Sequence, residues 1–109
     1  MGWFEILRAV DGQFYFNLMA SNAKVILTSE MYTQKHNVQN GIQSVQTNST
    51  DRDRFERKES ANGEPYFVLR AKNHEVIGTS EMYSSNQARE TGIASVMTNG
   101  PTKDIRDFS

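Results

Sequence analysis

The sequence TSEMY occupies residues 28–32 and occurs again, unchanged, at residues 79–83. Shifting the chain by 51 residues aligns it with itself without a gap, and 21 of the 45 positions from Phe4 to Asn48 are then identical. Identity spread over so many positions indicates a tandem duplication. TSEMY is therefore one element of a repeated structural unit, and its recurrence alone is no evidence of a functional motif.

Each unit begins with a pattern typical of antiparallel strands. Residues Trp3–Arg8 predict a strand that leads to a tight turn at Asp11-Gly12, and this turn becomes Asn62-Gly63 in the second unit. Asp-Gly and Asn-Gly favour the positive φ angles of hairpin turns. Gln13–Ala20 predicts a second strand because every second residue is apolar, and Val25–Ser29 predicts a third. Three strands joined by short turns therefore open the unit.

A helix follows the third strand in each unit. In the first unit Val38, Ile42 and Val45 recur at helical spacing. We expect Thr33 and Ser84 to be the N-caps, because hydroxyl side chains can accept a hydrogen bond from the free N–H groups of the first turn.

Both helices carry a glycine near the middle, Gly41 in the first unit and Gly92 in the second. A glycine in a helix interior costs about 1 kcal/mol relative to alanine. Its presence in both copies predicts a close approach of each helix to the sheet or to its partner helix. A ligand held against the helix backbone is the alternative.

The two units share one continuous chain without a linker. Residues 52–60 follow the first helix and form the first strand of the second unit, and they are long enough to serve both units. The repeat also predicts a final strand within residues 103–108. A unit of about 50 residues is marginally stable alone. We therefore expect a single α+β domain, residues 1–109, in which tandem β3-α-β repeats (approximately 1–51 and 52–109) form one antiparallel sheet with two helices packed on it, pseudo-twofold symmetry and exchanged C-terminal strands.

This pattern resembles the YegP-like family of small uncharacterised bacterial proteins. The resemblance is carried by FYFNLMASN at residues 14–22, VILTSEMY at 25–32, and the helix sequence NGIQSVQTN at 40–48 with its second copy TGIASVMTN at 91–99. It covers nearly the whole chain and both copies, as in the duplicated branch of the family. It implies a β3-α-β unit, with two units forming one sheet and exchanging their last strands. It implies no established activity, substrate, cofactor or catalytic residue.

Composition restricts the classes of partner. Twelve basic and 13 acidic residues give a net charge of −1, so the basic surface of a nucleic-acid-binding protein is absent and anionic membranes are disfavoured. The chain has no cysteine, and its first ten residues contain no apolar run of signal-peptide length. We expect a cytoplasmic protein. Because the two repeats complete each other, we also expect a monomer.

Glu30 and Glu81 are the candidate carboxylates, since both copies of TSEMY contain one. If the two repeats bring them together at the pseudo-twofold axis, each would perturb the pKa of the other, as in an acid–base or cation site. Alternatively, each carboxylate accepts backbone N–H groups at the start of a helix, where the helix dipole favours negative charge.

Tyr15 and Tyr66 are the candidate residues of a binding surface. If Phe16 points toward the helices, alternation along the strand turns Tyr15 to the opposite face of the sheet, and Tyr66 is its equivalent in the second repeat. Exposed tyrosines among polar groups suit a protein partner or a small ligand. Alternatively, they stack across neighbouring strands and support the sheet.

The remaining motifs indicate no cofactor, and we expect none. The two histidines, His36 and His74, stand at non-equivalent positions of the repeat, and no further ligands stand at zinc-binding spacing, so no metal site is expected. No nucleophile motif or phosphate-binding loop is present. The sequence therefore favours a non-catalytic binding or interaction module with an unknown protein or small-molecule partner. A small enzyme or ligand-binding protein that uses Glu30 and Glu81 is the alternative.

Overall fold

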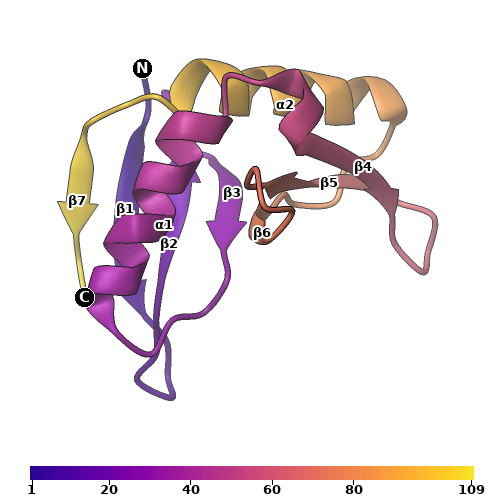
Figure 1. Cartoon of the computed structure of the whole chain (residues 1–109). Helices are drawn as coiled ribbons and strands as arrows, with labels where there is room; N and C mark the ends of the chain where they lie inside the picture. The colour runs from indigo at the N-terminus through magenta and orange to yellow at the C-terminus, as the bar shows by residue number, and fades with distance from the viewer.

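The computed structural model describes all residues, Met1 to Ser109. Each repeat contributes three strands and a helix, a short 3₁₀ turn joins the repeats, and a seventh strand follows the second helix (Figure 1). The elements are β1 (Trp3–Arg8), β2 (Phe14–Met19), β3 (Val25–Ser29), α1 (Lys35–Asn48), η1 (Arg52–Arg54), β4 (Phe55–Glu59), β5 (Pro65–Arg70), β6 (Val76–Thr79), α2 (Asn86–Asn99) and β7 (Ile105–Asp107).

The seven strands form one sheet in the order β4-β5-β6-β3-β2-β1-β7. The two halves join through a short antiparallel contact between β3 and β6 that pairs only Thr28 with Thr79 and Ser29 with Gly78. Figure 1 shows the strands of the two halves running in clearly different directions on either side of this joint. Each helix contacts strands of both halves, so the helices hold the joint together. The predicted fold class is confirmed.

One hydrophobic core serves both repeats. It consists of 16 buried side chains that come from the strands and helices of the two halves together. The repeat is visible inside it, because Phe4 lies edge-on against Phe16 with ring centroids 5.7 Å apart, and the equivalent Phe55 and Phe67 lie at the same separation. Either repeat folded alone would lose the core side chains that the other supplies, and the two repeats therefore form a single folding unit.

Two contacts locate the pseudo-twofold axis. A residue can lie beside its own equivalent only where the symmetry axis passes between them. Thr28 and Thr79 are equivalents and pair directly across the β3–β6 joint. At the other side of the molecule, Ser49 lies against its equivalent Gly100, where a Cβ built on the glycine would be 2.5 Å from the Cβ of Ser49. The axis therefore runs from the centre of the sheet to the point where the two helices end.

The strand exchange takes place once. The strand β7 of the second repeat lies parallel to β1 of the first, held by bonds from the Phe4 amide to the Asp104 carbonyl and from the Phe108 amide to the Ile6 carbonyl, both 2.8 Å. The sheet is therefore antiparallel except at this pair. No strand lies outside β4, because the chain that leaves α1 forms η1 and enters β4 directly. Residues 52–60 thus supply the first strand of the second repeat but no last strand for the first.

The helix starts differ by one residue from the prediction. The N-cap of α2 is Ser85, whose hydroxyl accepts a hydrogen bond from the Ala88 amide at 3.0 Å, and Ser84 lies outside the helix. The N-cap of α1 is Gln34, whose side chain makes no capping bond, so Thr33 does not cap either. The second repeat carries two serines in a row, and the one nearer the helix is used.

Candidate functional site: paired clefts between the repeats

The serine of TSEMY closes the end of the third strand in each repeat. The Ser29 hydroxyl accepts a hydrogen bond from the Phe16 amide at 2.9 Å and donates to the Glu30 carbonyl at 2.7 Å. Ser80 makes the equivalent bonds in the second repeat, at 3.0 and 2.7 Å. Both serines are buried. A buried hydroxyl that satisfies two backbone groups explains why this residue recurs.

The tyrosine of TSEMY explains the glycine in the helix. Tyr32 exchanges two backbone hydrogen bonds with Phe14, at 2.7 and 2.8 Å, and these bonds direct its ring toward α1. A Cβ built on Gly41 would lie 2.7 Å from the Tyr32 hydroxyl oxygen, and a Cβ on Gly92 would lie 2.6 Å from Cζ of Tyr83. The predicted close approach is therefore between each helix and a tyrosine that precedes it, which only glycine permits.

Partial burial raises the pKa of the Tyr32 and Tyr83 hydroxyls. The Tyr32 pKa is raised further by the charges of Glu30 and Glu75, and the Tyr83 pKa by that of Glu81. Each phenol therefore stays protonated at neutral pH and remains able to donate a hydrogen bond.

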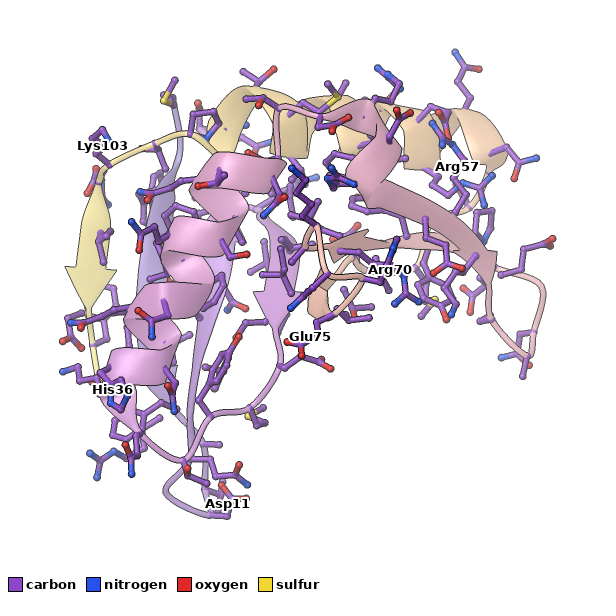
Figure 2. All side chains as sticks on the ribbon, in the orientation of Figure 1. Asp11, His36, Arg57, Arg70, Glu75 and Lys103 are labelled. Carbon is purple, nitrogen blue, oxygen red and sulfur yellow. The ribbon has the colours of Figure 1, made fainter.

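A cleft lies beside each tyrosine, between the helix of one repeat and the β-turn of the other. The first cleft has a volume of about 430 Å³ and the second about 410 Å³. Figure 2 shows Glu75, a residue of the first cleft, between the two halves of the sheet. From the first repeat, the first cleft is lined by Tyr32, Asn37, Asn40, Gly41 and Ser44. From the second repeat it is lined by Ala71, Asn73, Glu75, Val76 and Ile77.

The second cleft is the symmetry equivalent of the first. Each of the ten residues that line the first cleft has its equivalent, 51 residues away, in the lining of the second, which contains Glu81 in addition. Seven of the ten pairs are identical. The other three pairs are Asn37 with Ala88, Asn40 with Thr91, and Glu75 with Lys24. The two clefts therefore share their shape and their tyrosine but differ in polar chemistry.

The turns that complete the clefts are held by their own asparagines. The Asn73 side-chain oxygen accepts a hydrogen bond from the Glu75 amide at 3.1 Å, and Asn22 does the same for Lys24. The residue between them has a positive φ in both turns, 66° at Ala23 and 72° at His74. A residue other than glycine in this region costs about 1–2 kcal/mol. Such strain is found at functional sites more often than elsewhere.

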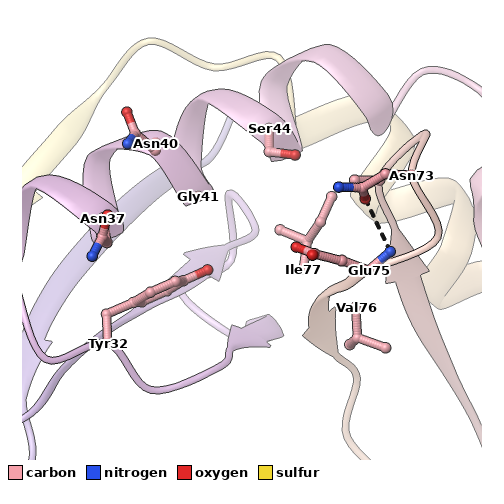
Figure 3. A pocket seen from close by; sticks show the side chains of 10 residues that line it. Tyr32, Asn37, Asn40, Gly41, Ser44, Asn73, Glu75, Val76 and Ile77 are labelled. Atoms are coloured by element: carbon pink, nitrogen blue, oxygen red, sulfur yellow. Dashed lines mark hydrogen bonds between the residues drawn. The ribbon is translucent and has the colours of Figure 1, made fainter.

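The side chains of the first cleft converge in Figure 3. The hydroxyl end of Tyr32 and the carboxylate of Glu75 point toward one another from the two repeats, and the side chains of Ser44 and Asn73 lie above them. The Asn73 amide nitrogen is free, because the hydrogen bond of its turn uses the oxygen. The Ser44 oxygen accepts a bond from Asn48 at 3.2 Å, which leaves its hydrogen available. Besides the amides of Asn37 and Asn40, the cleft thus offers the donors of Tyr32, Ser44 and Asn73 and one carboxylate.

Glu30 and Glu81 do not line a common cleft. Glu81 lines the second cleft and Glu30 lines neither, and both residues are exposed. Neither carboxylate accepts a hydrogen bond from the start of a helix. The capping role is filled in the second repeat by Ser85. The two carboxylates act on the tyrosines instead, through the pKa shifts described above.

None of the other candidate residues lines a cleft. Tyr15 and Tyr66 are half-buried on β2 and β5, opposite Leu7 and Lys58 on the neighbouring strands. His36 stands exposed near the start of α1, and His74 occupies the β5–β6 turn. No group of three or more histidine, cysteine, aspartate or glutamate side chains is placed to hold a metal ion.

Most of the cleft residues are not marked as site residues by any pattern in the sequence. Lys24 and Glu75 stand in turns, and nothing local to either turn shows that it will face the helix of the other repeat. One signal was available, because a tyrosine precedes a helix glycine by nine residues in both copies, at Tyr32 with Gly41 and at Tyr83 with Gly92.

Neither helix of the chain combines the length and the apolar character that a membrane crossing requires.

Comparisons with known proteins agree with this description. The family described as domain of unknown function DUF1508 matches residues 9–56 and again residues 60–107. The YegP protein of Yersinia pestis is 53% identical over 109 residues, which covers all of this chain and 97% of the relative. The YegP protein of Escherichia coli K12 is 50% identical over 106 residues, covering 97% of this chain and 96% of the relative.

Two relatives have solution NMR structures. A UPF0339 protein of Shewanella oneidensis is 53% identical and superimposes with a TM-score of 0.92, covering 97% of this chain and 90% of that one. The E. coli protein, described as a protein of unknown function, is 50% identical with a TM-score of 0.93, covering 98% and 92%. The chain belongs to the YegP-like UPF0339 family, in which the repeated unit is the DUF1508 domain.

Proposed function

We propose that this protein is a non-catalytic binding module that holds small polar groups in the two clefts between its repeats. The groups belong either to a small organic molecule or to a partner protein. The observation that carries the proposal is the equivalence of the clefts, since all ten residues that line the first have their counterparts in the second. Each cleft exists only because both repeats are present, and the duplicated chain is therefore suited to act as a monomer.

The chemistry of the lining supports recognition. Concave sites with a mixture of apolar walls and a few directed polar groups are typical of ligand binding. In the first cleft the apolar wall is Val76 and Ile77, and the directed groups are the hydroxyls of Tyr32 and Ser44 and the amide of Asn73. In the second cleft Glu81 is an additional binding residue. A cytoplasmic location, which the lack of cysteine suits, is part of the proposal.

The sheet face with Tyr15 and Tyr66 is the second candidate surface. Both side chains are half-buried on strands β2 and β5, on the side of the sheet opposite the core phenylalanines. Half-buried tyrosines present a rigid apolar body and a polar tip, which suits contact with a protein partner.

The clefts are tested by blocking one at a time. We expect small organic fragments, titrated into ¹⁵N-labelled protein, to shift the amide resonances of Gly41 and Gly92, because one of these glycines lies in each cleft. Ser44→Trp fills the first cleft and should abolish the shifts at Gly41 while those at Gly92 remain. Ser95→Trp is the matched control and should give the opposite result. Fragment shifts that survive both substitutions, or that occur only at residues outside the clefts, would overturn the proposal.

A further inference from the structure

One position of the clefts is reversed in charge between the two repeats. Glu75 in the first cleft is the equivalent of Lys24 in the second. The same turn presents both residues, because the amide of each donates to the side-chain oxygen of the asparagine two residues earlier, Asn73 or Asn22, at 3.1 Å. The clefts therefore differ by two units of charge at a matched position on a matched backbone.

Neither charge is neutralised within the protein. All seven salt bridges of the chain form between other residues, so Glu75 and Lys24 are both unpaired. Both are exposed, and substituting them removes no packing contact of the core. Lys72, which shares the β5–β6 turn with Glu75, is exposed and does not line the first cleft. An unpaired carboxylate is thus the only charged group in the lining of that cleft.

The groups around Glu75 match the hydrogen-bonding needs of a cation. An ammonium group has three donors and no acceptor. The first cleft can meet it with the Glu75 carboxylate and with the Tyr32 hydroxyl oxygen, which point toward one another from the two repeats. In the second cleft Lys24 takes the position of Glu75, and the one carboxylate of that lining, Glu81, stands at a different position, between β6 and α2.

We infer that the first cleft binds a primary ammonium or guanidinium group, and that the second cleft rejects such a group because Lys24 stands where Glu75 does in the first. The inference rests on the proposed function, since it assigns a ligand class to one of the two clefts. A lysine or arginine side chain of a partner protein and a small free amine carry the same group.

Three probes with the same carbon chain test the charge selectivity: n-butylammonium chloride, sodium butyrate and 1-butanol. Each is titrated into ¹⁵N-labelled protein at low salt, with the amides of Gly41 and Gly92 as reporters of the first and second cleft. We expect n-butylammonium to shift Gly41 and to leave Gly92 in place. Glu75→Gln should weaken this binding about fivefold, the upper range for a charge pair exposed to water. The preference should fall with added salt, because exposed charges are screened.

The charge exchange Glu75→Lys with Lys24→Glu is the decisive variant. It keeps both residue types, the net charge and both turns, and n-butylammonium should no longer shift Gly41. Equal shifts with n-butylammonium and butyrate at Gly41, or a preference that survives Glu75→Gln and the exchange, would overturn the inference. If 1-butanol still shifts both glycines in that case, the clefts bind ligands without selecting charge and the proposed function stands. If none of the probes shifts either glycine, the inference and the proposed function both fail.

Discussion

The contact between Ser49 and Gly100 predicts that Gly100→Ala destabilises the protein, and that removing the side chain of Ser49 restores the lost stability. Both residues are buried where the two helices end on the pseudo-twofold axis. Gly100 has a φ of −58°, which alanine adopts readily, so Gly100→Ala carries no backbone strain of its own. The added methyl group would lie 2.5 Å from the Ser49 Cβ, however, and closer still to its hydroxyl oxygen. Rotating the serine side chain cannot remove the contact with its Cβ.

The magnitude follows from two opposing effects. Forcing an extra methyl group into a packed site costs about 1–3 kcal/mol. Replacing glycine by alanine returns about 0.4–1 kcal/mol, because the unfolded chain loses conformational freedom. We therefore expect Gly100→Ala to lower the free energy of unfolding by about 1–2 kcal/mol. For a domain of this size, that corresponds to a fall in Tm of about 4–16 °C.

Ser49→Gly should relieve the contact. The Ser49 hydroxyl oxygen is buried without a hydrogen-bond partner, so its removal releases a desolvation cost that offsets the added flexibility of glycine. Ser49→Gly alone should therefore change stability little. In the double variant both nearest contacts of the new methyl group are absent, and only the Val96 carbonyl, 2.8 Å away, remains to be accommodated by a small backbone shift.

Urea denaturation of the wild type, the two single variants and the double variant gives the coupling free energy between the positions. We expect at least about 1 kcal/mol, with the double variant more stable than Gly100→Ala alone. The reasoning is refuted if Gly100→Ala leaves the unfolding midpoint unchanged, or if the two substitutions add without coupling. Either result would mean that the helix ends do not meet as described.

Three further predictions concern separate parts of the molecule. Lys35, together with hydrogen bonds from Ser109, lowers the pKa of Asp107, so β7 should be held above about pH 4 and loosen as the pH falls below that value. Faster amide exchange in β7 at low pH would show this, and Lys35→Met should reduce the pH dependence, because Lys35 is the largest cause of the shift. Ser29→Ala leaves a buried backbone amide without an acceptor and should cost about 1–3 kcal/mol by urea denaturation, whereas an unchanged midpoint would mean that the bond contributes nothing. Glu90→Gln weakens the two 2.6 Å contacts with Arg57 and should lower the free energy of unfolding by at most about 1 kcal/mol. If this loss is electrostatic, the thermal melts of the variant and the wild type should nearly coincide in 1 M salt.

Much of the fold could be predicted because its determinants are local. The strands Trp3–Arg8 and Val25–Ser29 have the bounds that their sequence pattern indicates. The predicted hairpin turns contain glycines with φ of 86° at Gly12 and 79° at Gly63, values that an L-residue rarely adopts. The helix start was less predictable, because Ser84 and Ser85 are both good caps and the sequence pattern does not distinguish between them.

The candidate site could not be predicted because it depends on how the repeats cross. Tyr32 and Glu75 stand 43 positions apart in the sequence and belong to different repeats. They meet only because β3 and β6 pair over two residues at a steep crossing, which carries the turn of one repeat to the helix of the other. The repeat explained why Glu30 and Glu81 recur. It could not reveal that both are exposed and that only one of them lines a cleft.

The single strand exchange has a consequence for adding further repeat units to this fold. A separate unit can send its last strand across to a neighbour and keep its first strand as well. When two units are fused end to end, the segment after α1 must become β4 at once, and the sheet has seven strands where two free units would supply eight. Covalent fusion thus replaces one intermolecular strand by one peptide connection. A third unit joined in the same way after Ser109 would cost β7 its place beside β1, because that segment would have to begin the new unit. Adding a unit in this way would therefore remove the parallel strand pair that closes this edge of the sheet.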